Sequence, residues 1–392
     1  MEFKVLVTTS GTGSRLGELT KYTNKALVKV GKKPVISYII ENYPKNTEFV
    51  VTLGYFGDQV RDFLALAYPE LRVTFVDVDT YQGEGSSLGY SMLQAKEHLQ
   101  CPFIYQACDT IVTEPIDAPG RNWIAGFRGQ GSSQYASFDS INGKLQKIYD
   151  KGMMDPDYIH IGLVGINDYE NFWKFLEKAY SDDPKNSSLN DVDALRLLVS
   201  QGITFDVKGY KEWHDIGNVE SLHNARKNIK DEFRILDKPE ESIFIFNDFV
   251  IKFFSDKNIA IDRVKRAKNL EGIVPNILAS TENFYKYEYS TGALYADVAN
   301  SIDITSLVTW GEKNLWKETS EVSQEDFKKV CLDFYCTKTK KRVEQFFATR
   351  SIADTEHVIN GQQVPTIQEL LQQVDFDYLA IAEQTGFHGD FI

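Results

Sequence analysis

Apolar residues in the first part of the chain follow two different spacings. Short continuous apolar runs, such as KVLVTTS at 4–10, are typical of buried strands, whereas apolar positions three or four apart are typical of helices. This pattern predicts strands at 4–10, 48–54, 72–78 and 102–110, with helices at 33–44, 56–69 and 86–99 between them. Strands that alternate with helices predict a mostly parallel sheet covered by helices on both faces.

The alternation weakens after residue 110 and then returns. It predicts a strand at 158–166, helices at 169–180, 191–202 and 218–233, and a strand followed by a loop within 203–217. A polar stretch that contains Pro239 follows at 234–242 and is predicted to be a linker. We therefore expect two domains, 1–233 and 234–392.

The second domain has a different pattern from the first. Its sequence predicts two short strands within 243–254, a basic helix at 260–272, a strand-like aromatic stretch at 283–295, and mainly helices from there to 384. The two short strands are joined by an Asn-Asp pair, which is typical of a turn. The fold is thus predicted to be α/β in the first domain and α+β in the second.

Composition narrows the class of protein. The 392 residues carry a formal net charge of −13, which argues against a broad basic surface for nucleic acid. The apolar runs are too short to span a bilayer, and the first strand begins so early that we expect no signal peptide. The four cysteines have no zinc-site spacing: Cys101, Cys108, Cys331 and Cys336. We therefore expect a cytoplasmic protein with free thiols, no nucleic-acid partner and no membrane insertion.

A glycine-rich loop directly follows the first strand. The sequence GTGSR at 11–15 lets backbone N–H groups converge on an anion, because a Cβ would obstruct that approach. A Walker loop is excluded, since its Gly-Lys-Ser/Thr is missing. A dinucleotide loop lacks its third glycine, because Leu16 occupies that position. The remaining pattern is Gly-x-Gly-Ser-Arg-Leu, followed ten residues after the arginine by Lys25 with Ala and Leu.

This third pattern resembles that of the nucleotidyltransferases that activate sugar phosphates and phosphocholine-like alcohols, and the resemblance extends over about residues 1–230. It implies a Rossmann-like, GT-A-like mixed sheet, mostly parallel and sandwiched by helices. It also implies that Arg15 and Lys25 hold the NTP triphosphate from two sides; the alternative is that both are solvated surface charges. Each cation–phosphate pair is worth roughly 4 kcal/mol at ~4 Å and an effective dielectric constant of ~20, before desolvation costs. The loop residues implied in nucleotide binding are Ser10, Gly11, Thr12, Gly13 and Ser14.

Two aspartates match the metal site of this family. Asp109 ends the strand at 102–110, and ligands of open parallel sheets bind beyond the carboxyl ends of the strands. Asp215 lies in WHDIGNVESL, which matches the second-carboxylate motif; a helix cap is its alternative role, although Asn218 is better placed for one. The usual Gly before the first aspartate is Cys108 here. The resemblance implies that both carboxylates bind Mg²⁺, which prefers oxygen ligands.

The same resemblance assigns residues around the rest of the substrates. Lys151 takes the place of the lysine that binds the phosphate of the second substrate, although Asp-Lys-Gly replaces the usual Glu-Lys-Pro. The stretch at 81–92 matches a loop near the base and ribose, and a plain helix cap by one of its serines is the alternative. Its candidate nucleotide-binding residues are Gly83, Gly85 and Ser86.

The second domain resembles the N-terminal part of the aminoglycoside/choline kinase family. DFVIKFF at 248–254 is similar to the strand with the ATP-phosphate lysine, here Lys252; the alternative is an edge-strand lysine that points to solvent. HGDF at 388–391 matches the start of the catalytic loop, with His388 and with Asp390 as its base.

The kinase resemblance is incomplete. In kinases the catalytic loop continues to metal-binding residues, which would lie beyond Ile392. We therefore expect an N-lobe at about 235–292 and a truncated C-lobe at about 293–392, without kinase activity in this chain. We expect the chain to be part of a longer, bifunctional protein in which a kinase supplies the phosphorylated substrate, as in surface polysaccharide precursor synthesis.

Together these features predict a Mg²⁺-dependent enzyme that transfers a nucleotidyl group from an NTP to a phosphorylated small alcohol or sugar and releases pyrophosphate. An acceptor phosphate would attack the α-phosphorus in line, without a covalent enzyme intermediate. CTP is favoured, because the run at 13–28 is most similar to phosphocholine-type cytidylyltransferases. Two alternatives are a regulatory nucleotide-binding protein and an NAD-dependent oxidoreductase. The sequence carries no signature of oligomeric state.

Overall fold

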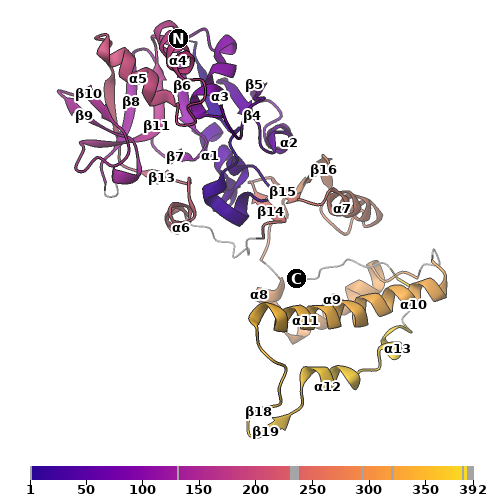
Figure 1. Ribbon diagram of the computed structural model, residues 1–392. Coiled ribbons are helices and arrows are strands. Elements are labelled where there is room, and N and C mark those ends of the chain that lie inside the picture. Colours follow the sequence, from indigo (N-terminus) through magenta and orange to yellow (C-terminus); the bar gives the residue numbers. More distant parts are fainter. Residues whose placement is uncertain are drawn as a thin grey trace. The chain divides into compact units, whose positions relative to one another are not determined.

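A nine-stranded mixed sheet lies at the centre of the first part of the chain in the computed structural model (Figure 1), with the order β5-β4-β1-β6-β11-β8-β12-β10-β9. The structure describes residues 2–129, 132–229, 238–293, 295–318, 322–381 and 384–385. The strands are β1 (Lys4–Thr8), β4 (Glu48–Leu53), β5 (Arg72–Asp77), β6 (Phe103–Ala107), β8 (Trp123–Phe127), β9 (Ser137–Ile141), β10 (Lys144–Tyr149), β11 (Tyr158–Ile166) and β12 (Asp206–Tyr210).

The first four strands of this sheet are parallel, as the sequence predicts. β5, β4, β1 and β6 pair in parallel, whereas β11 runs antiparallel to β6 and β8. β8 and β12 pair in parallel, and β9 and β10 complete the sheet with antiparallel pairs. The predicted mixed α/β architecture is therefore confirmed, with the parallel pairs concentrated around β1.

Helices cover both faces of the sheet. They are α1 (Val35–Glu41), α2 (Gly57–Ala67), α3 (Leu88–Gln94), α4 (Tyr169–Asp182), α5 (Asp191–Ser200) and α6 (Val219–Asn228). The side chains of a strand alternate between its faces, and β1 illustrates this. Val5 and Val7 belong to the apolar cluster that includes residues of α1 and α2, whereas Leu6 belongs to the cluster that includes residues of α3, α4 and α5.

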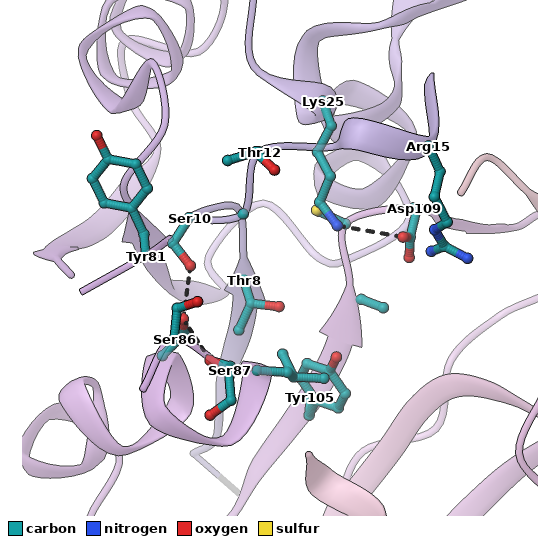
Figure 2. A pocket seen from close by; sticks show the side chains of 15 residues that line it. Thr8, Ser10, Thr12, Arg15, Lys25, Tyr81, Ser86, Ser87, Tyr105 and Asp109 are labelled. Atoms are coloured by element: carbon teal, nitrogen blue, oxygen red, sulfur yellow. Dashed lines mark hydrogen bonds and ion pairs between the residues drawn. The ribbon is translucent and has the colours of Figure 1, made fainter. Parts of the chain in front are cut away.

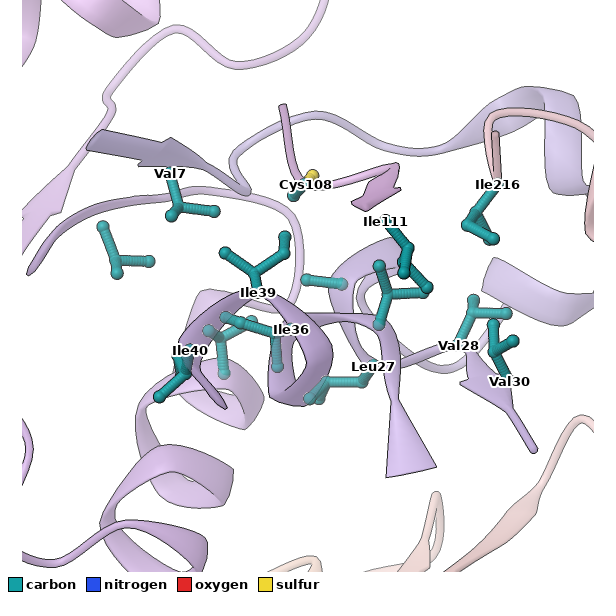
Figure 3. Close-up of a cluster of buried hydrophobic side chains, with 14 of the residues drawn as sticks. Val7, Leu27, Val28, Val30, Ile36, Ile39, Ile40, Cys108, Ile111 and Ile216 are labelled. Carbon is teal, nitrogen blue, oxygen red and sulfur yellow. The ribbon is translucent and has the colours of Figure 1, made fainter. Parts of the chain in front are cut away.

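The apolar cluster on the α1 side supports the glycine-rich loop, because it includes Leu16 directly after that loop. Ile36 and Ile39 of α1 lie among Leu27, Cys108 and Ile111 (Figure 3). Four 3₁₀ turns and two short β ladders complete this part: η1 (Ser14–Thr20), η2 (Lys25–Leu27), η3 (Lys96–His98) and η4 (Ser132–Gln134), β2 (Lys29–Val30) with β3 (Lys33–Pro34), and β7 (Thr110–Val112) with β13 (Trp213–Asp215).

A second, four-stranded antiparallel sheet follows with the order β14-β15-β17-β16. Its elements are β14 (Glu241–Ile245), β15 (Phe249–Phe254), α7 (Lys257–Asn269), β16 (Ile277–Ser280) and β17 (Phe284–Glu288). Contacts divide the chain into two compact units, Met1–Ser290 and Thr291–Ile392, so this sheet belongs to the same unit as the large sheet. The predicted domain boundary after residue 233 lies outside the described residues and stays a prediction.

The second unit is mainly helical, as predicted, with one hairpin that the sequence pattern does not reveal. Its elements are α8 (Tyr295–Val298), α9 (Ser301–Asn314), α10 (Gln324–Leu332), the π-helical turn η5 (Asp333–Thr337), α11 (Lys338–Arg350), β18 (His357–Ile359), β19 (Gln362–Val364), α12 (Ile367–Gln372) and α13 (Phe376–Leu379). Within the described ranges, no helix combines the length and the hydropathy that crossing a bilayer requires.

Candidate active site

The glycine-rich loop leaves the carboxyl end of β1 and turns back at Gly13. This residue has a φ of 66°, and a Cβ there would lie 2.9 Å from the Cβ of Lys25. The backbone N–H of Leu16 donates to the Gly13 carbonyl at 2.9 Å, which begins η1. The side chain of Leu16 is 2% exposed and anchors that turn in the core. A glycine is therefore required here for both backbone conformation and space.

Asn24 fixes the segment that carries Lys25. It is fully buried, and its side-chain amide donates to the carbonyls of Thr9 at 2.8 Å and Tyr55 at 2.6 Å. Its Oδ1 accepts from the N–H of Ala26 at 2.8 Å. Asn24 thus ties η2 to the loops that follow β1 and β4, so that Lys25 starts from a fixed backbone.

The ladder between β7 and β13 brings the two predicted metal carboxylates together. Asp109 directly precedes β7, and Asp215 pairs with Thr110 in the antiparallel register. The N–H of Ile216 donates to the carbonyl of Asp109 at 2.9 Å. Two aspartates more than a hundred residues apart are therefore adjacent in the fold, because both lie at the same end of this ladder.

Two cations flank Asp109. Lys25 Nζ donates to Asp109 Oδ2 at 3.3 Å, and Arg15 lies on another side of this carboxylate (Figure 2). Burial alone would raise the pKa of Asp109, but the charges of Lys25 and Arg15 lower it by more, so the pKa lies below its usual value. Burial likewise lowers the pKa of Lys25, but Asp109 and the neighbouring Cys108 together more than offset this, so the pKa of Lys25 is raised. The pair is therefore ionised at neutral pH.

Asp215 is held by neutral donors. Tyr135 donates its hydroxyl to Asp215 Oδ2 at 3.0 Å, and the N–H of Gly217 donates to Oδ1 at 3.0 Å. A Cβ on Gly217 would lie 3.1 Å from both Arg15 Nη2 and Asp215 Oδ1, and 3.5 Å from Asp109 Oδ2. One guanidinium and both carboxylates therefore converge on a single point beside residue 217.

A cavity of about 370 Å³ opens next to this point. Its walls come from the glycine-rich loop, the stretch before α3 and the end of β6. Most of its polar side chains are hydroxyls, and the lining residues are Thr8, Ser10, Gly11, Thr12, Arg15, Lys25, Tyr81, Ser86, Ser87, Leu88, Ser91, Tyr105, Ala107, Cys108 and Asp109. Ser10 Oγ and Ser91 Oγ are 2.8 Å apart, which links two of these walls. Cations at one end and hydroxyls along the rest suit a polyphosphate attached to a polar group.

The structure brings most of the predicted site residues to this cavity. Those that line it are Ser10, Gly11, Thr12, Arg15, Lys25, Ser86 and Asp109, and Asp215 adjoins it through residue 217. Gly13, Ser14, Gly83 and Gly85 belong to the same two loops but do not line the cavity.

Two further predicted residues are not brought to the cavity. Lys151 lies on an exposed turn outside the lining, and Lys252 lies on β15 of the small sheet. His388 and Asp390 fall outside the described residues. The assigned roles of all these residues stay predictions.

Several residues of the site carry no signal in the sequence. Tyr105 lines the cavity, and Asn24 and Tyr135 support it through hydrogen bonds to distant segments. Asn24 directly precedes Lys25, but only its complete burial and three hydrogen bonds identify it as a support of the loop.

The donor set at the site suits Mg²⁺. Asp109 and Asp215 supply carboxylates, and the described part of the chain contains no group of three or more His, Cys, Asp or Glu side chains able to hold a metal. A metal here would take its remaining ligands from nucleotide phosphates and water, which is how Mg²⁺ is commonly bound. Asp109 and Asp215 would hold this ion, and it would neutralise charge on the phosphates.

We expect Cys108 to be chemically inert, although it adjoins Asp109. Its side chain is 1% exposed, and burial raises the pKa of the thiol to about 11. At pH 8 this lowers the thiolate fraction roughly a hundredfold relative to an ordinary thiol. Iodoacetamide labelling followed by mass spectrometry should modify the partly exposed Cys336 first and Cys108 only after denaturation. Equal labelling rates for the two thiols in the native protein would contradict this expectation.

Gly217→Ala should disturb the site without unfolding the protein. The new Cβ would lie 3.1 Å from the flexible ends of Arg15 and Asp215, which must each shift by a few tenths of an ångström. Since small displacements of charged groups weaken catalysis strongly, we expect about a tenfold loss of kcat/KM. The exposed Gly120, whose Cβ would meet nothing within 4 Å, provides the control Gly120→Ala. A Gly217→Ala variant as active as this control would place the reacting groups elsewhere.

Known proteins resemble the first part of the chain. No model of a protein family matches the chain. A bifunctional protein GlmU from Methanococcus vannielii is 21% identical over 217 residues, which cover 53% of this chain and 50% of the relative. A choline-phosphate cytidylyltransferase from Streptococcus pneumoniae is 32% identical over 106 residues, which cover 26% of this chain and 44% of the relative. The chain thus spans half or less of the length of these relatives.

Solved structures agree with the sequence relatives. The structure of CTP:phosphocholine cytidylyltransferase from Streptococcus pneumoniae superposes with a TM-score of 0.50 and 20% identity, covering 59% of this chain and all of the other. The predicted nucleotidyltransferase fold is therefore confirmed, and relatives and structural neighbours of this chain are nucleotidyltransferases. These comparisons do not confirm the predicted kinase-like domain, which stays a prediction.

Proposed function

We propose that the chain is a Mg²⁺-dependent nucleotidyltransferase that joins the nucleotidyl group of an NTP to a phosphorylated small alcohol or sugar and releases pyrophosphate. The observation that carries this proposal is the convergence of Arg15, Lys25, Asp109 and Asp215 at the carboxyl end of β1 and β6. This arrangement offers two positive groups to a polyphosphate and two carboxylates to a metal in one place. An oxidoreductase has no comparable use for a pair of adjacent carboxylates and cations.

The geometry suggests how each group acts. Lys25 and Arg15 neutralise the triphosphate and the departing pyrophosphate, because both reach the cavity beside the glycine-rich loop. Lys25 leaves its ion pair with Asp109 when phosphate oxygens become its partners. Asp109 and Asp215 would hold the Mg²⁺, which would supply further neutralisation of the phosphates. Catalysis then rests on positioning and charge, and no residue needs to form a covalent intermediate.

CTP is the nucleotide that we favour, with a phosphorylated amino alcohol or sugar as the acceptor. A relative and a structural neighbour from Streptococcus pneumoniae carry names that specify a choline-phosphate cytidylyltransferase, which supports this choice. The acceptor phosphate is assigned to Lys151, whose exposed turn is joined to the loop before β9 by a hydrogen bond from Gly152 N–H to the Ser133 carbonyl at 2.9 Å.

One experiment tests the proposed function. Purified protein is mixed with Mg²⁺, each of the four common NTPs and a panel of phosphorylated alcohols and sugars, and pyrophosphate release is measured. We expect release that needs both substrates and is fastest with CTP. Binding of NTP without pyrophosphate release for any acceptor would favour the regulatory alternative, and nicotinamide reduction in a parallel assay would favour the oxidoreductase.

We further propose that residues 238–290 form the N-lobe of a kinase-like module. The small sheet has the order β14-β15-β17-β16 with α7 between β15 and β16, and Lys252 lies in the middle of β15. The test is transfer of phosphate from ATP to small alcohols, amino alcohols and sugars. We expect none from this chain, and turnover of any of them would contradict the expectation.

A further inference from the structure

Tyr135 lies beside the site and has no role in the mechanism above. It follows the 3₁₀ turn η4, in the connection between β8 and β9. The carbonyl of Ala136 accepts from His160 N–H at 2.9 Å, and the carbonyl of Ser133 accepts from Gly152 N–H at 2.9 Å. The connection is thus held on both sides of Tyr135, which gives its side chain a fixed starting point.

The ring of Tyr135 is also held in place. It packs edge-on against Trp213, with the ring centroids 5.1 Å apart and the planes at 75°. Trp213 in turn contacts Phe127, with the ring centroids 5.6 Å apart. Trp213 and Asp215 are two residues apart on β13, so their side chains lie on the same face of that strand. Tyr135, which packs against Trp213, can therefore also donate a hydrogen bond to Asp215.

We propose that Tyr135 is a positioning residue for the second metal carboxylate: its hydroxyl, fixed by Trp213, holds Asp215 in one orientation beside Asp109. This rests on the proposed function, since it assigns a metal to these two aspartates. The hydroxyl donates to Oδ2 while Gly217 N–H donates to Oδ1, so both oxygens of the carboxylate are restrained. A phenol orients a carboxylate without cancelling its charge, whereas a lysine in the same place would compete with the metal.

The hydrogen bond also connects the metal site with the acceptor side. Tyr135 is two residues from Ser133, whose carbonyl is bonded to the residue after Lys151. We therefore expect displacement of Tyr135 to weaken metal binding first and acceptor binding second, with the KM for NTP unchanged. A variant with this order of effects has lost a positioning contact, whereas a general loss of structure would weaken metal, acceptor and nucleotide binding together.

Tyr135→Phe tests the proposal, because it removes one hydroxyl and keeps the ring against Trp213. Mn²⁺ binding is measured directly by water-proton relaxation, first with protein alone and then with CTP, in the absence of any acceptor. We expect affinity for Mn²⁺ about tenfold weaker than in the unaltered protein, as is usual when a partner of a metal ligand is lost. The Mg²⁺ concentration that gives half-maximal pyrophosphate release should rise by a similar factor, with the KM for NTP unchanged.

Two further variants make the outcome decisive. Tyr68→Phe removes a comparable bond, from a phenol to Glu41 Oε1 at 2.8 Å, away from the cavity, and should bind Mn²⁺ like the unaltered protein. Asp109→Asn should abolish the binding. If the unaltered protein binds Mn²⁺ and Tyr135→Phe binds it equally well, the positioning role is wrong. If Asp109→Asn binds as tightly as the unaltered protein, or if the unaltered protein binds none, the proposed metal site itself is wrong.

Discussion

Replacement of Asp109 by asparagine is expected to lower kcat at least about 100-fold, which is the usual effect of removing one electrostatic stabiliser. The side chain keeps its shape but can no longer attract the metal. Lys25, which now donates to Asp109 Oδ2 at 3.3 Å, would lose its anionic partner, and Arg15 would lose the charge beside it. Because both cations remain available to the triphosphate, we expect the KM for NTP to stay the same or to fall. The measurement is steady-state pyrophosphate release at the Mg²⁺ concentration that saturates the unaltered protein.

A strand-end aspartate outside the site provides the matched control. Asp77 ends β5, a parallel strand of the same sheet, but its side chain is 81% exposed and its partner is Arg61. Asp77→Asn should keep the rate of the unaltered protein. Near-normal turnover by Asp109→Asn would remove this carboxylate from the reaction, and a parallel rise in the KM for NTP would indicate a binding role in place of a metal role.

The pH dependence of the ion pair follows from the lowered pKa of Asp109. The carboxyl is ionised in the folded protein at lower pH than in the unfolded chain, where its pKa is about 3.9. Its contribution to stability is therefore complete above that value and disappears as the pH falls through the lower folded pKa. If the reaction rate falls as the pH is lowered, protonation of Asp109 should not contribute to that fall above about pH 5.

The parallel part of the fold could be predicted because its signal is local. β1, β4 and β6 are mainly apolar runs with most residues buried; β1 is followed by the glycine-rich loop, β4 by a segment with helical spacing and β6 by a strand-end aspartate. Buried strands of this kind are recognised from a few neighbouring residues. The glycine-rich loop is equally local, since its residues are consecutive.

The rest of the sheet is predicted only in part: the sequence indicates strands at 158–166 and within 203–217, but not β8, β9 and β10, because their partners are distant and these strands are mixed in character. β8 pairs with β12 about eighty residues later, and β10 shows only two buried positions among polar ones. β7 and β13 have three residues each, too short for a periodic pattern, although their ladder is what unites Asp109 with Asp215. From the sequence, that union followed only from resemblance to a family.

The small sheet shows a further limit of the sequence. The domain boundary that a polar linker predicts near residue 233 stays a prediction, but the sequence pattern does not indicate that the sheet at 241–288 belongs to the same compact unit as the large sheet. The spacing in α2 predicts an amphipathic helix that packs on a single sheet. Phe63 of this helix, however, contacts an aromatic ring more than 180 residues away. No spacing rule within the helix reveals which of its apolar residues serve the second sheet.

Phe63→Ala is expected to lower the free energy of unfolding by about 3–5 kcal/mol, the usual cost of truncating a fully buried phenylalanine. Phe63 is 0% exposed, and its ring centroid lies 5.3 Å from that of Phe244 and 6.4 Å from that of Phe284. The small sheet is also bonded to α2 directly, because Lys286 Nζ donates to the Leu66 carbonyl at 2.9 Å. The loss of stability is measured by urea unfolding followed by fluorescence.

A comparison with a shortened chain shows whether the small sheet is the cause. In a chain of residues 1–229 the aromatic partners Phe244 and Phe284 are absent, so Phe63→Ala should cost much less there than in the full chain. Phe172 of α4 is the matched control, since it is 1% exposed and packs against Phe103 within the large sheet's own core. Phe172→Ala should cost the same in both chains. An equal cost of Phe63→Ala in the two chains would mean that the large sheet alone buries this side chain, and that the two sheets are separate folding units after all.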